Sequence, residues 1–319
     1  MYTMQPLVSV ICLCHNHKPF LEEAIESVLT QTYSNIELIV VDDASTDGCK
    51  DVLERLCQEH DLLYIDLPKN IGNCAAFNKG FSQARGKYII DFATDDVMLP
   101  HRIEQQVRFF EMQEPNVGVV FSNAEIIDED GNLLKLHYLI DDQGNVKDSV
   151  PEGDVYSEVL SRYFISPPTM MMRREVLNDL GGYDESLAYE DFAFWVRSAR
   201  IYQYAFQPHC LTKVRRVKAS LSTKLYEKGD RQLESTYRVC LKAANMNRCR
   251  RDELALIKRL RYEMRHAVLT GNYKEALLFF DLLKKLEGVN LSSYLFYVLH
   301  FLHLPLMRLR NLYLKLRYA

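Results

Sequence analysis

Apolar runs and segments of helical periodicity alternate through the first half of the chain. Residues 7–14 (LVSVICLC) form a short, β-branched apolar run, which is typical of a strand buried on both faces of a sheet. Apolar residues then recur at helical spacing after Pro19, and residues 37–41 (ELIVV) predict a second strand. A strand, a helix and a strand in this order predict a βαβ unit with parallel strands.

The same alternation continues to about residue 122. We expect further helices over about 46–60, 74–84 and 100–114, and strands near 62–66, 88–92 and 117–122. The pattern predicts an α/β fold in which helices flank a doubly wound, mostly parallel sheet. Farther along, DEDGN at 128–132 indicates a hairpin turn, a strand is expected over 169–173, and a helix is expected to begin near Glu190.

The pattern changes near residue 225, beyond which long helical segments follow one another. One of them is predicted to carry five apolar residues on a common face: Leu254, Ile257, Leu260, Met264 and Val268. We therefore predict two domains, with residues 1–225 forming the α/β domain and residues 226–319 forming a helical C-terminal region.

The end of the helical region combines apolar and basic residues. No charged residue occurs from Gly288 to Met307, a length that could span a bilayer, but Asn290 and Pro305 argue against a span. The last residues are basic, with no acidic residue after Glu287. Two interpretations stay open: an aromatic, basic tail that lies on an anionic membrane surface, and a helical bundle that packs on the α/β domain.

Composition narrows the classes of partner. Hydrophobic residues make up 48% of the chain and charged residues 26%, ordinary values that exclude wholesale disorder and a polytopic membrane protein. A net charge of -4 provides no global positive field, so nucleic acid is not expected as a partner. The eight cysteines are scattered and no signal peptide is recognisable, so we expect a reduced, cytoplasmic protein, at most peripherally attached to the inner face of the membrane.

Two pairs of aspartates directly follow predicted strands. Asp42 and Asp43 end the second predicted strand, and Asp95 and Asp96 follow the fourth. Ligands of open α/β sheets bind beyond the carboxyl ends of the strands, so both pairs are candidate site residues. For Asp42, capping of the turn stays open as the alternative, whereas Asp43 is placed to accept a hydrogen bond from a ligand N–H group such as that of a uracil ring.

The pair Asp95 and Asp96 is suited to a metal ion. Adjacent carboxylates repel each other unless a cation neutralises them, and hard oxygen ligands in small number favour Mg²⁺ or Mn²⁺ shared with a diphosphate. The alternative is a turn followed by the cap of the helix after Pro100. No glycine-rich dinucleotide motif, P-loop or nucleophile elbow is present, so the chemistry is expected to come from carboxylates.

Two further groups of charged residues are candidates. Glu190 and Asp191 precede the aromatic segment FAFW, where a partly desolvated carboxylate gains basicity and suits a general base. The alternative is that these acidic residues only stabilise the amino end of a helix. Arg215 and Arg216 either supply positive charge near a diphosphate or belong to a solvated basic stretch.

Taken together, these motifs resemble the family 2 inverting glycosyltransferases with the GT-A fold. The resemblance covers about residues 7–225, in family order, through the segments VSVICLCHN, AIESVLTQTY, ELIVVDDASTD, NIG with NKG, GKYI with TDD, and GGYDE with ED. It implies a nucleotide-sugar half over about 1–122 and an acceptor half over about 123–225. It also implies that Asp43 contacts the nucleotide base, that Asp95 and Asp96 bind the nucleoside diphosphate and the metal, and that Asp191 is the catalytic base.

The resemblance also implies a function. We expect a hexosyltransferase-like enzyme that moves a sugar from a nucleotide-sugar donor, a UDP-sugar, to a glycan, lipid-linked or protein acceptor in the biosynthesis of cell-surface polysaccharides or glycoconjugates. The expected cofactor is Mn²⁺ or Mg²⁺. The sequence departs from the family at four positions: His15 stands where tyrosine is common, Phe77 where arginine is frequent, Ala93 where many members have aspartate, and Val217 where histidine is frequent.

Two other functions stay open. A sugar nucleotidyltransferase also uses an α/β sheet and aspartates, but it favours a glycine-rich, basic loop after the first strand, and residues 13–20 contain neither glycine nor arginine. A catalytically inactive homologue that serves as a scaffold for glycan assembly is the other alternative. Retention of the acidic site residues argues against it.

Overall fold

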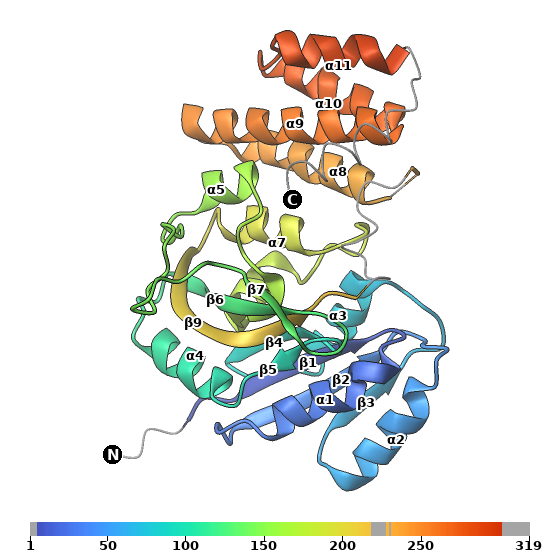
Figure 1. The fold of residues 1–319 in the computed structure, drawn as a ribbon, viewed down its shortest axis with the longest axis vertical. Coiled ribbons are helices and arrows are strands. Elements are labelled where there is room, and N and C mark those ends of the chain that lie inside the picture. Colours follow the sequence, from blue (N-terminus) through green and yellow to red (C-terminus); the bar gives the residue numbers. More distant parts are fainter. Residues whose placement is uncertain (1–4, 218–227, 230, 302–319) are drawn as a thin grey trace. The chain divides into compact units, whose positions relative to one another are not determined.

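The computed structural model describes residues 5–217, 228–229 and 231–301, and the chain divides into two compact units (Figure 1). The first, which we call the sheet unit, comprises Met1–Val155, Phe164–Ser186 and Arg197–Lys218. The second, the helical unit, comprises Tyr156–Tyr163, Leu187–Val196 and Ala219–Ala319. The boundary predicted near residue 225 lies outside the described residues.

In its described part, the sheet unit contains one nine-stranded sheet with the order β3-β2-β1-β4-β8-β6-β9-β5, and β7 pairs with β6. The first four strands are mutually parallel, as expected from the sequence: β1 (Val8–Cys14), β2 (Ile36–Asp42), β3 (Leu63–Asp66) and β4 (Tyr88–Ala93). Antiparallel pairs then join β4 to β8 and β8 to β6. The remaining strands are β5 (Val97–Met98), β6 (Val117–Ile127), β7 (Leu133–Leu136), β8 (Met171–Arg173) and β9 (Gln203–Arg215).

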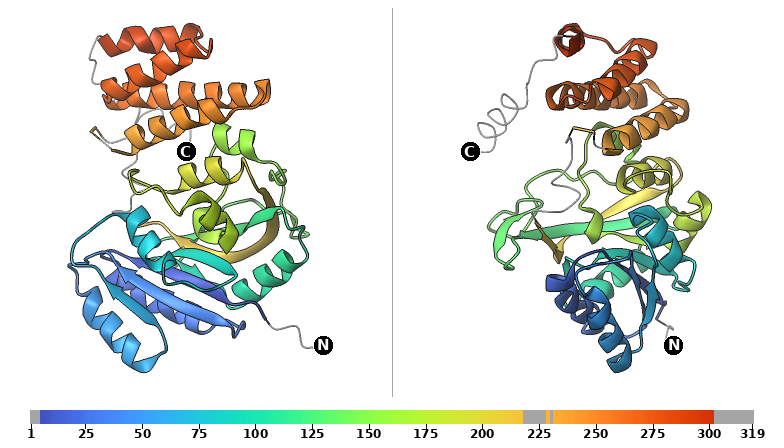
Figure 2. Two further views of the ribbon diagram at one scale, coloured as in Figure 1. Left: turned by 180° about the vertical axis from the view of Figure 1, so that it is seen from behind. Right: turned by 90° about the vertical axis from the view of Figure 1, so that its right-hand side faces the viewer.

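Helices cover both faces of the parallel strands (Figures 1 and 2). All seven residues of β1 are buried, and its even-numbered residues pack in one core with α1 (Lys18–Leu29), α2 (Cys49–Glu59) and α4 (Arg102–Glu111). Each fully buried aliphatic side chain contributes roughly 1.5–3 kcal/mol to this core. On the other face α3 (Asn73–Phe81) approaches closely, because a Cβ on Gly80 would lie 2.5 Å from Cγ2 of Ile11.

The second half of the sheet contains a long strand that the sequence did not reveal. In β9, a proline and several polar residues interrupt the apolar pattern, yet the strand pairs along β6 in parallel through several register shifts. β6 is also longer than the predicted 117–122, and the predicted hairpin turn at 128–132 joins it to β7. A 3-10 turn (Pro167–Thr169) precedes β8, and α6 (Arg174–Leu180) follows it.

The helical unit contains α5 (Tyr156–Ser161), the first residues of α7 (Asp191–Ser198), α8 (Arg231–Met246), α9 (Arg250–Thr270), α10 (Tyr273–Lys285) and α11 (Leu291–Phe301). Four of the five predicted core positions on α9 are buried, but Leu254 is 52% exposed because it lies at the edge of that helical face. Among the described residues, no helix is long and apolar enough to cross a bilayer. The basic residues from Arg308 to Arg317 lie outside the described residues.

Candidate active site

Asp42 stabilises the turn that follows β2. Its side chain is buried, and its Oδ1 atom accepts hydrogen bonds from the backbone N–H of Ser45 at 3.0 Å and from the Ser45 hydroxyl. A buried carboxylate engaged in this way sets the path of the chain after the strand. Of the two interpretations of Asp42, the structure supports turn capping.

Asp43 connects the end of β2 to the loop in front of α3. Its Oδ1 accepts the N–H of Ile71 at 2.7 Å and its Oδ2 accepts the N–H of Gly72 at 2.9 Å. Nδ1 of His15 lies 2.8 Å from the Asp43 carbonyl oxygen, and Nδ2 of Asn70 lies 3.2 Å from Nε2 of His15. We call these five residues the Asp43 group. Each carboxylate oxygen has a second lone pair, so Asp43 can also accept a hydrogen bond from a ligand.

Two sequence motifs that lie about a hundred residues apart meet at α3. Nδ2 of Asn78 donates to the carbonyl oxygen of Tyr183 at 2.9 Å, and its Oδ1 accepts the Tyr183 N–H at 2.9 Å. Gly182 has a φ of +79°, and a Cβ there would lie 2.5 Å from Oδ1 of Asn78. Phe77 is fully buried and stacks on the Tyr183 ring, so it packs in the core where the family often has a charged arginine.

Asp95 and Asp96 lie in the turn after β4, at the sheet edge where β2 also ends. Asp96 is 3% exposed, and its Oδ1 accepts the backbone N–H of Arg215 at 2.8 Å. Burial raises the pKa of Asp96 well above its ordinary value, and the nearby charge of Asp95 adds to the increase, whereas Arg215 and Arg102 oppose it. A nearby cation stabilises the ionised form of two adjacent carboxylates of which one is buried.

The guanidinium of Arg215 holds this turn in place. Only 2% of its side chain is exposed, and Nε donates to the carbonyl oxygen of Asp95 at 2.9 Å. Nη1 donates to the carbonyl oxygen of Glu129 at 3.0 Å, and Nη2 to the carboxylate of Glu23 at 2.6 Å. The expectation of a solvated basic stretch is therefore wrong for Arg215, although Arg216 is exposed. Because its donors are engaged, Arg215 positions the Asp95–Asp96 turn.

A second buried cation, Arg102, acts electrostatically on the same turn. It is fully buried near the start of α4, where Nε donates to Oε1 of Gln106 and Nη2 to the carbonyl oxygen of Met170, both at 3.2 Å. Burial lowers the pKa of Arg102 to about 9, and attraction to Asp96 opposes that decrease. No pattern in the sequence distinguished this arginine from a surface residue of an amphipathic helix.

The residues of this turn fit a divalent cation that is shared with a ligand. Among the described residues, no group of three or more histidine, cysteine or acidic side chains forms a complete metal cage. Mg²⁺ is commonly bound by one or two carboxylates together with water and substrate phosphates, and Asp95 and Asp96 supply that number. The nearest imidazole is His17, whose Nδ1 lies 3.0 Å from Oγ1 of Thr94 and 3.9 Å from Oδ1 of Asp95.

Asp191 begins α7 and belongs to the helical unit. It follows a segment anchored to α8: the N–H of Ala188 donates to Oγ of Ser235 at 2.9 Å, and the hydroxyl of Tyr189 lies 2.6 Å from Oγ1 of Thr236. Asp191 is partly exposed, whereas the five residues after it are buried. A partly exposed carboxylate beside apolar side chains keeps both sequence interpretations open, because it also lies in the first turn of its helix.

Comparisons with known proteins identify the family. Residues 9–181 match the family model "Glycosyl transferase family 2". An uncharacterised glycosyltransferase of Methanocaldococcus jannaschii is 31% identical over 221 residues, which make up 66% of this chain and 71% of that protein. The putative teichuronic acid biosynthesis glycosyltransferase TuaG of Bacillus subtilis is 28% identical over 229 residues, which cover 70% of this chain and 84% of TuaG.

Two solved structures have a similar fold. S. aureus TarS in complex with UDP-GlcNAc has a TM-score of 0.67 at 18% identity, covering 89% of this chain and 82% of that chain. The mannosyltransferase PcManGT of Pyrobaculum calidifontis, in complex with GDP-Man and Mn²⁺, has a TM-score of 0.59 at 18% identity, covering 93% of this chain and 80% of that chain. The expected GT-A fold is thus confirmed, and the chain belongs to glycosyl transferase family 2.

Proposed function

We propose that the protein is an inverting, metal-dependent glycosyltransferase that transfers a hexose from a nucleotide-sugar donor, a UDP-sugar, to a glycan, lipid-linked or protein acceptor. The observation that carries the proposal is the Asp95–Asp96 pair at the end of β4, held by the buried Arg215 and located at the same sheet edge as the Asp43 group. This edge is where open α/β sheets bind nucleotides.

The donor is bound by the sheet unit in this proposal. Asp43 accepts a hydrogen bond from an N–H group of the base, while its contacts with the loop at 70–72 keep the carboxylate in place. Asp95 and Asp96 bind the diphosphate and hold Mn²⁺ or Mg²⁺. When bound, the ion neutralises the negative charge that develops on the departing diphosphate. Residues 1–122 then form the nucleotide-sugar half, 123–225 the acceptor half, and 226–319 the helical C-terminal region.

Asp191 is the proposed general base. Its carboxylate takes the proton of the acceptor hydroxyl as that oxygen forms a bond to the anomeric carbon. The bond from this carbon to the diphosphate oxygen breaks in the same step, and the nucleoside diphosphate leaves with the bonding electron pair. A single in-line displacement inverts the anomeric configuration, and a positioned base of this kind contributes about 10²–10⁴-fold to the rate.

The relatives support this proposal without fixing the substrates. TarS has been solved with UDP-GlcNAc, and PcManGT has been solved with GDP-Man and Mn²⁺, which supports binding of a nucleotide-sugar and a divalent metal ion by this chain. The name of TuaG refers to teichuronic acid biosynthesis, which supports a role in cell-surface polysaccharide assembly. A cytoplasmic location, peripheral to the inner face of the membrane, is part of the same proposal.

The test is a thermal unfolding series with UDP, GDP, CDP and dTDP, each with Mn²⁺, with Mg²⁺ and with a chelator. A ligand that binds only the folded state raises the unfolding temperature by mass action, and we expect an increase with UDP only when metal is present. No increase with any nucleotide would favour the inactive scaffold. Release of pyrophosphate from a nucleoside triphosphate and a sugar phosphate would instead identify a nucleotidyltransferase.

A further inference from the structure

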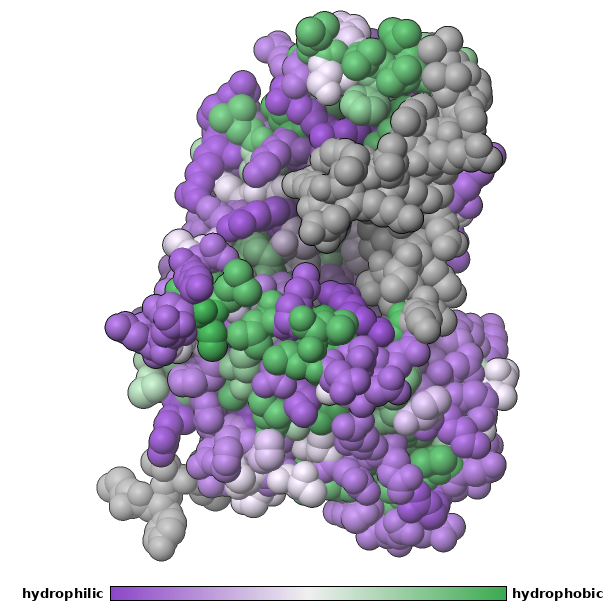
Figure 3. Space-filling view, in the orientation of Figure 1, coloured by the Kyte–Doolittle hydropathy of each residue, from purple (hydrophilic) through white to green (hydrophobic). Residues whose placement is uncertain are grey.

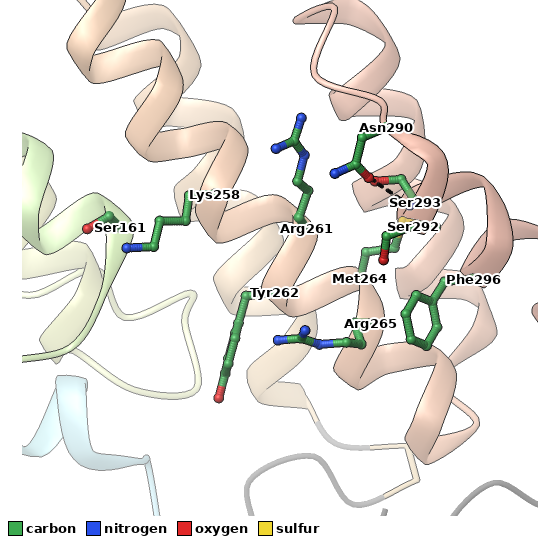
Figure 4. Close-up of a pocket in the computed structure, with 10 residues that line it drawn as sticks. All are labelled: Ser161, Lys258, Arg261, Tyr262, Met264, Arg265, Asn290, Ser292, Ser293 and Phe296. Carbon is green, nitrogen blue, oxygen red and sulfur yellow. Dashed lines mark hydrogen bonds between the residues drawn. The ribbon is translucent and has the colours of Figure 1, made fainter.

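A cavity of about 300 Å³ lies between α9 and α11 in the helical unit, with Ser161 of α5 at its margin (Figure 4). Basic residues of α9 form one wall, and the segment from Asn290 to Phe296 forms the other. None of the described residues that line the cavity is acidic. The proposed sugar transfer uses none of them, so this cavity needs its own explanation.

Three cations from one side of α9 line the cavity; in Figure 4 the Lys258 ammonium points toward Ser161 and the Arg265 guanidinium toward Tyr262. Lys258, Arg261 and Arg265 occupy positions i, i+3 and i+7 and therefore share a helical face. Arg261 donates through Nε to the carbonyl oxygen of Gly288 at 2.9 Å, which fixes its stem beside the opposite wall. Glu263 cannot neutralise them, because it is buried and paired with Arg259.

The opposite wall adds neutral donors to these cations. Oδ1 of Asn290 accepts the backbone N–H and the hydroxyl of Ser293 at 2.9 Å and 2.8 Å, which leaves the amide NH₂ group of Asn290 to donate. α11 begins at the next residue, so the positive end of its dipole lies at this wall. The hydroxyl of Ser292 also lines the cavity. Cations and N–H or O–H donors on opposite walls suit a phosphate group.

α11 carries an apolar stripe next to this cavity. Leu291 is 88% exposed, and Leu295 and Val298 are more than half exposed, at positions i, i+4 and i+7. Figure 3 shows hydrophobic side chains gathered over α11 at the top of this view. The inner face of the same helix is buried at Ser293 and His300. The stripe borders the cavity because Leu295 lies three residues after Ser292 and is therefore its neighbour on the helix surface.

We propose that this surface docks on an anionic phospholipid bilayer. The phosphate of one lipid headgroup enters the cavity between Lys258, Arg261 and Arg265, and the apolar stripe of α11 inserts at the boundary between headgroups and acyl chains. Clustered cations beside an exposed apolar helix face are the two features that interfacial membrane binding requires. A protein partner for an apolar stripe would not need three cations around an adjacent cavity, and a cavity of about 300 Å³ has room for a phosphate with the rest of its headgroup. The inference does not depend on sugar transfer.

The test is binding of the full chain to vesicles of phosphatidylglycerol and of phosphatidylcholine by flotation. We expect binding to the anionic vesicles only. The double variant Arg261→Gln/Arg265→Gln should lower the partition coefficient about thirtyfold, since two surface cations are removed. The control Arg108→Gln/Lys147→Gln removes the same charge from exposed positions of the sheet unit and should lower it far less. Leu295→Ser/Val298→Ser should weaken the binding that remains at high salt.

A measurement on the unmodified chain keeps the test independent of folding defects. Millimolar inorganic phosphate should compete with anionic vesicles more strongly than chloride of equal ionic strength. Equal binding by the cavity variant and the control variant would overturn the proposal, as would equal binding to both lipids. Thermal stabilisation by inorganic phosphate without any vesicle binding would also overturn it and would indicate a soluble phosphorylated ligand.

Discussion

The backbone N–H of Arg215 donates a hydrogen bond of 2.8 Å to Oδ1 of Asp96, although 119 residues separate the two along the chain. The last residue of β9 thus orients the second carboxylate of the turn after β4. Its guanidinium holds the carbonyl oxygen of Asp95, so one residue of β9 contacts both members of the pair. The geometry of the proposed metal site therefore depends on the pairing of two distant parts of the sheet.

Replacement of Asp96 tests the metal site. Asp96→Ala should abolish the metal dependence of nucleotide binding, because one of the two proposed ligands is lost. Asp96→Asn keeps the shape and the acceptor for the Arg215 N–H, so it should show the same loss with a smaller effect on folding. Calorimetric titration of UDP with and without Mn²⁺ measures both. Unchanged metal dependence in both variants would place the ion on other groups.

The raised pKa of Asp96 predicts how the stability of the metal-free protein changes with pH. Well below the unfolded-state pKa of about 3.9, the carboxyl is protonated in both states and contributes no difference. Between this value and the higher pKa of the folded state, the carboxyl is ionised only in the unfolded chain, so the free energy of unfolding falls as pH rises and levels off above the folded-state pKa. Asp96→Asn should therefore become more stable relative to the wild type as pH rises. Urea unfolding at several pH values in chelator measures this, and a constant difference would contradict it.

Arg215→Gln tests the positioning role of this arginine. The substitution leaves the partly buried carbonyl oxygens of Asp95 and Glu129 without these donors, which should lower the free energy of unfolding by about 1–3 kcal/mol. Metal-dependent nucleotide binding should weaken as well, because the turn loses its support. Arg216→Gln is the matched control, since Arg216 is exposed and carries the same charge. If Arg215→Gln and Arg216→Gln changed stability and nucleotide binding to a similar extent, Arg215 would not have the positioning role.

Asp191→Asn tests the proposed base. Sugar transfer should fall by about 10²–10⁴-fold, while metal-dependent UDP binding stays close to normal. Glu190→Gln is the neighbouring control and should retain most of the activity. If the Asp191 variant transfers sugar at a near-normal rate, the base lies elsewhere, and Glu190 becomes the next candidate.

Asp43→Ala separates base binding from metal binding. The N–H groups of Ile71 and Gly72 lose their acceptors, so their hydrogen exchange should accelerate. Affinity for UDP in the presence of Mn²⁺ should fall while its dependence on the metal is retained, in contrast to the Asp96 variants. Ser45→Ala removes a hydroxyl that contacts Asp42 and the N–H of Asn16 but not Asp43, so it should leave both properties nearly unchanged. Normal exchange at Ile71 and Gly72 would show that the loop does not depend on Asp43.

The parts of the fold that could be predicted are those with local periodicity. The strands β1 to β4 were predicted from apolar runs, and the helices between them from apolar residues that recur at helical spacing. Acidic motifs directly follow two of these runs, which places Asp43 and Asp95 at strand ends. β9 escaped prediction because its inward and outward positions do not alternate regularly where the strand pairs with β6 through register shifts. Leu254 was misplaced because the edge of a helical face is poorly defined by spacing alone.

The sequence by itself determined the α/β fold class, the family, and the acidic residues on which the proposed chemistry depends. Each of these is specified by short segments of consecutive residues and can be recognised without knowing which distant residues they contact. Only the tertiary structure decided that Arg215 is a buried support, that Arg102 lies within electrostatic reach of Asp96, and that three cations of α9 meet the start of α11 around a cavity. Whether an arginine is solvated or buried depends on which carbonyl oxygens and carboxylates other elements bring to it. Pairing across a sheet and packing between helices set those distances, and spacing along the chain does not encode them.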